Sequence, residues 1–449
     1  MKLSSSRKLF FKGTHRASPT KETKEMVLDK VKRSNLPVFD KVINISAYNK
    51  SKIPVYAVLH SKRFGRCRLP GWKCTGTGRC CSGCTIPSWG KGLTGDAALV
   101  SGLMERIERY TASDIFIRQN EVIFSNFYSL KEKGAISRWD FVPCNLQRKL
   151  YSKKDVDKQV RPWVRCFSLI KNRDVFIPSN LVFFSSEWCK NDFSDTTGLA
   201  TGNNLEEAIL HALCEVIERH LEEVVCGNKI KVPTIDIGSI EDPSLQTLIR
   251  RLQIKENLHV QLSYMTGDFG VAAIRIFAYP RQSPYWNTYG IYSAIGVHPD
   301  KNVALARALT EFVQGMASSL YRIKQGYDKV NTCDSLPPEL FNFFDDIIDH
   351  SKKILFESVG SSCRADLLDD IHDILGVLAR KGCDVIVKDL THPQLGIPTV
   401  RVIVKGLQPG ILGISLPSPY HKVARISPWL NLYPRWLRKV KTADLVNGR

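Results

Sequence analysis

The chain has 449 residues, of which 43% are hydrophobic and 24% charged, a globular composition sufficient for one large domain or two medium ones. No apolar run approaches a membrane span and the basic N-terminus lacks the apolar core of a secretory signal, so we expect no membrane association and a cytoplasmic location. The net charge of +20 suits an anionic partner. Because no nucleic-acid-binding motif accompanies this charge, we expect a partner other than nucleic acid.

Helix and strand patterns alternate along the chain. An amphipathic stretch at 18–31 predicts a helix, and apolar β-branched runs at 42–45 and 53–59 predict strands. A Gly- and Cys-rich segment without periodicity follows. Further helices are predicted at 96–110, 205–224 and 302–323, and further strands at 164–169, 174–177, 259–264, 271–278 and 291–295. This interleaving favours an α+β (mixed α/β) fold with mixed sheets.

Three of the predicted helices repeat one pattern, Leu-x-Glu-x-(Ile/Val)-(Glu/Gln), beginning at Leu103, Leu213 and Leu309. Each follows a Gly-containing loop and begins with Asn, Asp or Thr available as an N-cap. Residues spaced by four, four and three positions share one stripe of a helix, because a turn takes about 3.6 residues. The stripes are Ala97, Ser101, Glu105 and Glu108; Glu207, His211, Glu215 and Glu218; and Val303, Arg307, Glu311 and Gln314.

If the stripes converge, five or six carboxylates share a small volume and raise one another's pKa. Hard cations would relieve the repulsion, and Mg²⁺ suits oxygen ligands and phosphates. The Gly-rich loops offer backbone N–H groups at helix N-termini, and Lys91 and Arg307 add positive charge. The pattern therefore predicts an ATP–Mg²⁺ site without the Gly-x-x-x-x-Gly-Lys-(Ser/Thr) loop. A purely structural repeat is the alternative.

These motifs resemble those of the YcaO family. The resemblance lies in Ser101-x-x-x-Glu105-x-x-Glu108-Arg109, in Thr197 to Asn203 followed by Glu207-Ala208, in Leu213-x-Glu215-x-x-Glu218-Arg219, and in Ala304-x-x-Arg307-Ala308-Leu309-x-Glu311-x-x-Gln314. It implies one large domain around a central ATP–Mg²⁺ site. Within it we expect an N-terminal helix–strand segment at 1–60, a Cys-rich insertion at 61–90, the ATP-binding core at 91–420 and a basic tail at 421–449.

The resemblance also implies roles for individual residues. Mg²⁺ would be held by Glu105, Glu108, Glu207, Glu215 and Glu218. ATP would be bound by Ser101, Asn203, Lys91, Arg219, Arg307, Glu311 and Gln314, with Asn203 and Arg219 on the phosphates and Ser101 and Arg307 nearer the nucleoside. The implied catalytic residues are Glu215, Glu218, Arg219 and Arg307.

The opening Phe11-Lys12-Gly13-Thr14-His15-Arg16 resembles the branch of the family that acts with TfuA proteins. That branch places a thioglycine in the alpha subunit of archaeal methyl-coenzyme M reductase. The tail lacks the Pro-x-Pro-x-Pro ending typical of azoline-forming cyclodehydratases. The resemblance thus implies ATP-dependent activation of a peptide-backbone amide, with sulfide attack giving a thioamide and a TfuA-like partner.

Five cysteines fall in one short segment: Cys67, Cys74, Cys80, Cys81 and Cys84. The Cys81-x-x-Cys84 pair has metal-ligand spacing, so Zn²⁺ or an iron–sulfur cluster is one interpretation. Sulfur handling and a loop with incidental cysteines are the others.

Alternative functions stay open at this stage: an azoline-forming cyclodehydratase of ribosomal peptides, a non-catalytic docking protein, and an RNA-thiolating enzyme. A protein or peptide is the expected substrate, and a homodimer is possible.

Overall fold

The computed structural model describes residues 1–11, 13–60, 87–113, 121–141, 153–183, 196–265, 268–282, 293–325, 342 and 344–407. Residues 61–86 of the predicted Cys-rich insertion, with its five cysteines, and the basic tail at 421–449 lie outside these residues, whereas residues 88–90 belong to a strand. In the described ranges no helix is long and apolar enough to cross a membrane.

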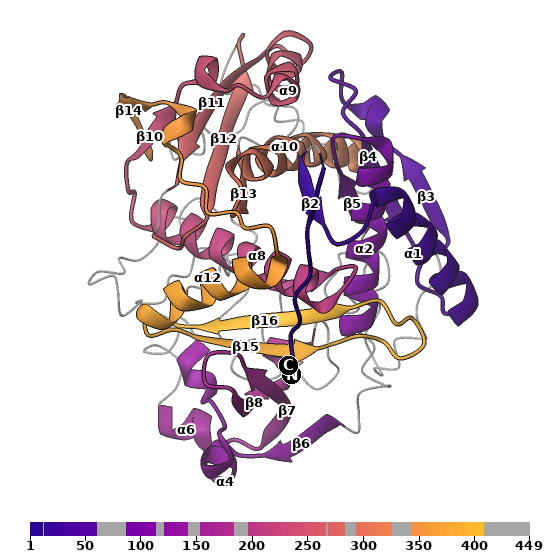
Figure 1. Ribbon diagram of the computed structural model, residues 1–449, viewed down its shortest axis with the longest axis vertical. Coiled ribbons are helices and arrows are strands. Elements are labelled where there is room, and N and C mark those ends of the chain that lie inside the picture. The colour runs from indigo at the N-terminus through magenta and orange to yellow at the C-terminus, as the bar shows by residue number, and fades with distance from the viewer. Residues whose placement is uncertain are drawn as a thin grey trace.

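Two larger sheets form the ends of the molecule, the five-stranded one at the top of Figure 1 and the six-stranded one at the bottom. The five-stranded sheet has the order β13 (Ser293–His298), β12 (Ala272–Pro280), β11 (Leu258–Tyr264), β10 (Val232–Ile235) and β14 (Ile348–Ile354). Its neighbours are antiparallel except β10 and β14.

The six-stranded sheet is antiparallel throughout. Its order is β6 (Val122–Ser125), β7 (Arg161–Ser168), β15 (Asp384–Asp389), β16 (Thr399–Lys405) and β9 (Leu199–Thr201), and β8 (Arg173–Pro178) pairs with β7. A smaller sheet contains β3 (Lys41–Asn44), β4 (Val55–Leu59) and β5 (Ser88–Lys91), and a hairpin joins β1 (Leu9–Phe11) to β2 (Thr14–Arg16).

Two of the long helices, α8 (Leu205–Gly227) and α10 (Lys301–Lys324), lie between sheets (Figure 1). The helices of more than ten residues are α1 (Thr20–Ser34), α2 (Gly95–Ser113), α8, α9 (Pro243–Ile254), α10 and α12 (Leu367–Arg380). The short ones are α4 (Phe127–Leu130), α6 (Lys153–Lys158) and α7 (Ser179–Val182). Figure 1 shows α8 and α10 in the middle of the molecule. Helix α8 packs on both β16 and β13, so its apolar residues are buried on more than one side.

A strand precedes each of the three patterned helices and packs against it: β5 before α2, β9 before α8, and β13 before α10. Two glycines make this approach possible. A Cβ on Gly90 would lie 1.9 Å from the Ala98 carbonyl oxygen, and one on Gly296 would lie 2.1 Å from the Ala304 carbonyl oxygen. Only glycine fits at these two positions, so the backbones of strand and helix can lie in contact. The contact places the end of the strand beside the acidic stripe of its helix.

The predicted mixed α/β fold class is confirmed, and each predicted helix is present with ends shifted by a few residues. Short strands such as β2, β5 and β9 were not predicted, because they have three or four residues and no alternating pattern. The domain boundaries stay a prediction.

Candidate functional site

The three patterned helices begin as predicted. The Asn204 side chain accepts a hydrogen bond from Glu207 N at the start of α8, and Asp300 accepts from Asn302 N and Val303 N at the start of α10. Thr94 Oγ1 accepts from Ala97 N at the start of α2. These caps fix the rotation of each helix, and therefore the direction in which its acidic stripe points.

Backbone amides hold three of the stripe carboxylates in place. Glu105 Oε2 accepts from Trp89 N at 2.9 Å, and Glu215 Oε2 accepts from Gly198 N at 3.0 Å. Glu108 reaches from α2 to β9, where its Oε1 accepts from Thr201 N at 2.9 Å and from Thr201 Oγ1 at 3.0 Å. The carboxylates are thus oriented by backbone groups in and next to strands β5 and β9.

Glu207 is the most heavily hydrogen-bonded of the five predicted metal ligands in the described structure. Asn203 Nδ2 donates to its two oxygens at 3.1 and 2.9 Å, and Ala17 N donates at 2.8 Å. Arg16 forms an ion pair with it at 3.4 Å. The N-terminal hairpin therefore reaches the acidic stripe of α8.

Helix α10 closes the site with charged and polar groups. Glu311 is ion-paired with Lys91, and Gln314 Nε2 donates to the Trp89 carbonyl at 2.9 Å.

Arg219, on α8, lies among carboxylates: it is 3.8 Å from both Glu215 and Glu218 and 3.5 Å from Glu222. Burial opposes the charge of Arg219, but these carboxylates outweigh it and raise the pKa of Arg219.

Burial, and after it the charges of neighbouring carboxylates, shift the pKa values of the stripe carboxyls. Burial raises the pKa of Glu108 to about 8, with Glu105 and Glu215 adding to the effect. Burial and the charge of Glu311 raise the pKa of Glu218 to about 8. The pKa of Glu215 is also raised, mainly by burial. Groups from α2, α8 and α10 therefore act on one another at short range, and the three predicted stripes converge.

The pKa of Glu311 moves the other way. Burial raises it, but the cations Lys91, Arg219 and Arg307 together lower it. His211, on the same face as the acids, has a pKa held well below its usual value by burial and by Arg307, Lys91 and Arg16. Part of the His211 side chain is nevertheless exposed to solvent. The site thus combines acidic side chains with several cationic ones, Lys91, Arg16, Arg219 and Arg307.

Among the described residues, two of these arginines have a buried N–H group that donates no hydrogen bond. In the described structure, Nε of Arg16 and Nε of Arg307 are buried without a hydrogen-bond partner. A buried N–H without a partner is costly, so each fits a site completed by an anion. The carboxylates can hold a cation, and the neighbouring arginine N–H groups can hold an anion. A Mg²⁺–triphosphate requires both kinds of group, so the residues present fit this ligand.

The raised carboxyl pKa values predict a pH dependence. Glu108 and Glu218 are mostly protonated below pH 8 and must lose their protons to bind a cation. Mg²⁺–ATP affinity should therefore increase between pH 7 and pH 9, by about tenfold for each group, because one pKa unit corresponds to a factor of ten. Titration calorimetry in two buffers of different ionisation enthalpy would count the released protons.

Glu108→Gln should reduce the number of released protons, whereas Glu132→Gln, at an exposed position, should leave it unchanged. Equal affinity at both pH values, without proton release, would contradict the assignment of these groups as cation ligands.

Sequence reasoning located most, but not all, of the converging groups. The structure places Glu105, Glu108, Glu215, Glu218 and Glu311 together, as predicted. Ser101 is only partly buried on α2, and among the described residues no hydrogen bond joins it to the acidic groups. Arg16, Thr201 and the Trp89 backbone were not predicted as site groups. The Gly13-Thr14-His15-Arg16 motif was the available signal for Arg16.

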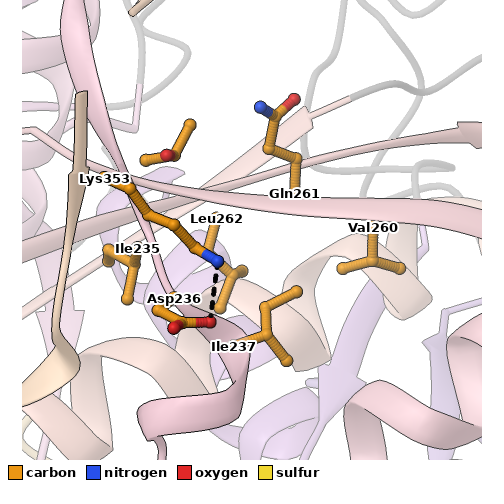
Figure 2. Close-up of a pocket in the computed structure, with 8 residues that line it drawn as sticks. Ile235, Asp236, Ile237, Val260, Gln261, Leu262 and Lys353 are labelled. Atoms are coloured by element: carbon orange, nitrogen blue, oxygen red, sulfur yellow. Dashed lines mark ion pairs between the residues drawn. The ribbon is translucent and has the colours of Figure 1, made fainter. Parts of the chain in front are cut away.

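A second, shallow pocket lies on the five-stranded sheet (Figure 2). Its charged groups, Asp236 and Lys353, satisfy each other at 3.0 Å, and the rest of its lining is largely aliphatic. Because none of its lining residues belongs to the acidic stripes, it is separate from the converging site.

Comparison with known proteins agrees with the converging site. Residues 89–408 match the model of the family of YcaO cyclodehydratases, which is described as ATP- and Mg²⁺-binding. An uncharacterized protein of Methanothermobacter thermautotrophicus is 30% identical over 340 residues, 71% of this chain and 81% of that protein. An uncharacterized protein in the tfuA 3′ region of Rhizobium leguminosarum bv. trifolii is 25% identical over 351 residues, 72% of this chain and 77% of that protein.

A solved structure has the same fold. It is that of YcaO from Methanopyrus kandleri bound with AMPPCP and Mg²⁺, with a TM-score of 0.69 and 21% identity over 92% of this chain and 99% of that one.

Proposed function

Because this chain belongs to the YcaO family, we propose that it uses ATP and Mg²⁺ to activate a backbone amide in another protein and convert it to a thioamide. The observation that carries the proposal is the convergence of acidic residues from α2, α8 and α10 beside two arginines with unused buried donors. Such a site can hold a cation and a polyphosphate at once.

Each converging residue has a role in this proposal. Glu105, Glu108, Glu207, Glu215 and Glu218 would hold Mg²⁺, which when bound neutralises charge developing on the transferred phosphate. Arg16 would bind phosphate oxygens through its buried Nε group, together with Asn203 and Arg219. Arg307, which the resemblance places nearer the nucleoside, also has a buried Nε group without a partner among the described residues, and we propose that it reaches the phosphates instead. Lys91, Glu311 and Gln314 would complete the wall, and Ser101 would lie nearer the nucleoside.

An amide carbonyl is a poor electrophile because resonance gives its C–N bond partial double-bond character. Transfer of the γ-phosphoryl group of ATP to the carbonyl oxygen converts that oxygen into a leaving group. Hydrosulfide then attacks the carbon, and phosphate departs with the former amide oxygen. Arg219 and Arg307 would stabilise the charge on the departing phosphate.

Two observations support thioamidation. The chain contains the Gly13-Thr14-His15-Arg16 motif, and a relative is encoded in the tfuA 3′ region of its organism. We therefore propose a TfuA-like partner, and as substrate a glycine in the alpha subunit of methyl-coenzyme M reductase.

Azoline formation, in which a substrate side chain attacks instead of sulfide, is the second candidate function, favoured by the family's description as cyclodehydratases. A metal or cluster on Cys81 and Cys84 stays a further proposal.

The two reactions leave opposite mass signatures. The enzyme, a TfuA partner, ATP, Mg²⁺ and sulfide would be incubated with a peptide from the alpha subunit, and the product analysed by mass spectrometry. We expect the peptide to become heavier by exchange of oxygen for sulfur at a glycine, only when ATP and sulfide are both present. A sulfide-independent loss of water would instead assign the protein to the cyclodehydratases.

A further inference from the structure

Next to the acidic site is a second cluster of reactive side chains: Cys363, His15 and Asp300. Cys363 Sγ lies 3.6 Å from His15 Nδ1, and His15 Nε2 lies 3.4 Å from Asp300 Oδ2. Lys8 Nζ, whose side chain is fully buried, donates to Cys363 Sγ at 3.1 Å. These residues come from three separate parts of the chain, so the fold assembles the cluster.

The geometry favours a nucleophile over a metal site. The three ligand atoms of the cluster lie within 4.8 Å of one another, but the thiol and the carboxylate face opposite nitrogens of the His15 ring. A single cation could use only one of those nitrogens, and the ammonium of Lys8, which is ion-paired with Asp370, already occupies the sulfur as a hydrogen-bond donor. A thiol, an imidazole and a carboxylate in sequence are the arrangement of an activated nucleophile and its base.

The protonation states suit this arrangement. Burial raises the pKa of the Cys363 thiol, although the Lys8 hydrogen bond opposes it, so the thiol needs a base. Burial also lowers the pKa of His15, although Asp300 opposes it, so the imidazole is neutral and able to accept the proton. Asp300 can accept a hydrogen bond from the Nε2–H group of His15. In that tautomer Nδ1 of His15 carries no proton and faces the Cys363 sulfur as an acceptor.

The backbone around the cluster is well anchored. Arg364 N donates to Asp370 Oδ1 at 2.7 Å, and Ser362 N donates to the Pro299 carbonyl at 3.0 Å, on either side of Cys363. Asp300 is the N-cap of α10 and uses Oδ1 for that purpose, which leaves Oδ2 facing His15. The nucleophile and the carboxylate are therefore held in position before any ligand binds.

The cluster adjoins the proposed ATP site. Arg16, the residue after His15, pairs with Glu207. The His15 ring packs edge-on against His298 with centroids 5.2 Å apart. Burial lowers the pKa of His298, and the charges of His15 and Arg307 add to this effect. Asp300 precedes Arg307 by seven residues on α10, about 10 Å along the helix. Cys363 is partly exposed, so a sulfur donor can reach it.

We propose that Cys363 is a sulfur-carrying nucleophile that receives sulfane sulfur from a persulfide donor and delivers it to the activated amide; the delivery step rests on the proposed thioamidation. His15 accepts the thiol proton, and the thiolate attacks the outer sulfur of the donor persulfide. The Cys363 sulfur–sulfur bond forms as the donor's bond breaks, and the donor departs as a thiolate.

Delivery needs two electrons, which a dithiol reductant supplies. The outer sulfur on Cys363 attacks the phosphorylated amide carbon, and phosphate leaves with the former amide oxygen. One thiol of the dithiol attacks the Cys363 sulfur, breaks the sulfur–sulfur bond and releases the thioamide. The second thiol then resolves the mixed disulfide, so Cys363 returns as a thiol and the dithiol becomes a disulfide.

The first test follows sulfur transfer without ATP. The full-length protein would be mixed with glutathione persulfide, and persulfides would be mapped by selective alkylation and peptide mass spectrometry. We expect rapid labelling of Cys363, slowed about 100-fold by His15→Gln because the base is lost. Asp300→Asn, which retains an N-cap side chain, should slow it less. Cys383→Ser should behave as wild type, and Glu215→Gln should still be labelled.

The second test follows the thioamide. With persulfide as the sulfur source and a dithiol present, Cys363→Ser and Cys363→Ala should lose product formation by about 100-fold, and free sulfide should restore it. Wild-type product formation by these variants, labelling confined to the Cys67–Cys84 segment, or stoichiometric zinc that disappears in Cys363→Ser would each overturn the proposal. Labelled Cys363 without thioamide from any sulfur source would refute the proposed function but not the nucleophile.

Discussion

Glu215→Gln is expected to abolish ATP turnover while leaving the protein folded. Glu215 is held by Gly198 N and acts electrostatically with Glu108 on α2 and Glu311 on α10, so it is a central member of the acidic site. A glutamine side chain has the same shape, and its carbonyl oxygen can still accept the Gly198 hydrogen bond. Only the charge is lost, and we expect a decrease in kcat of about 100-fold to 1000-fold, the usual effect of removing one electrostatic group.

The measurement is phosphate release in the presence of the protein substrate, with thermal unfolding followed in parallel. Glu222→Gln is a matched control, because Glu222 lies on the same helix and also pairs with Arg219, at 3.5 Å, but is 38% exposed. Turnover near the wild-type value in Glu215→Gln would exclude Glu215 from the reaction.

Gly296→Ala is expected to destabilise the protein severely. The new Cβ would lie 2.1 Å from the Ala304 carbonyl oxygen and 2.6 Å from Ala308 N, both backbone atoms of α10. Backbone in the middle of a buried helix cannot move aside as a flexible side chain can, so β13 and α10 would have to separate. We expect a loss of about 3 kcal/mol or more of unfolding free energy, or insoluble protein.

Urea denaturation would measure the loss, with Gly376→Ala as the control. Gly376 lies in α12, and the nearest atom to its added Cβ is at the end of the Arg380 side chain, 3.5 Å away. Alanine there should be neutral or stabilising by up to about 1 kcal/mol, because glycine is a poor helix former. Similar stability of the two variants would show that the strand does not need its close approach to the helix.

The sequence predicted those parts of the site that depend on local periodicity. The Glu stripes could be identified because the side chains of a helix recur every 3.6 residues, and because three copies shared one register. Residues brought in by long-range folding give no such signal. His15 and Cys363 are 348 positions apart in the chain, and Arg16 reaches Glu207 across 191 positions. Strands β5 and β9 escaped prediction for a different reason, since their few residues include glycine and small side chains.

Hydrogen bonds of the acidic site connect the β5–α2 unit to both of the other strand–helix units, β9–α8 and β13–α10. Glu105 and Gln314 contact the Trp89 backbone from α2 and α10, and Glu108 joins α2 to the Thr201 backbone in β9. Consequently neither α2 nor α10 can tilt by itself without breaking a hydrogen bond to a neighbouring unit. An opening that admits ATP or a peptide should therefore come from elements other than these two helices.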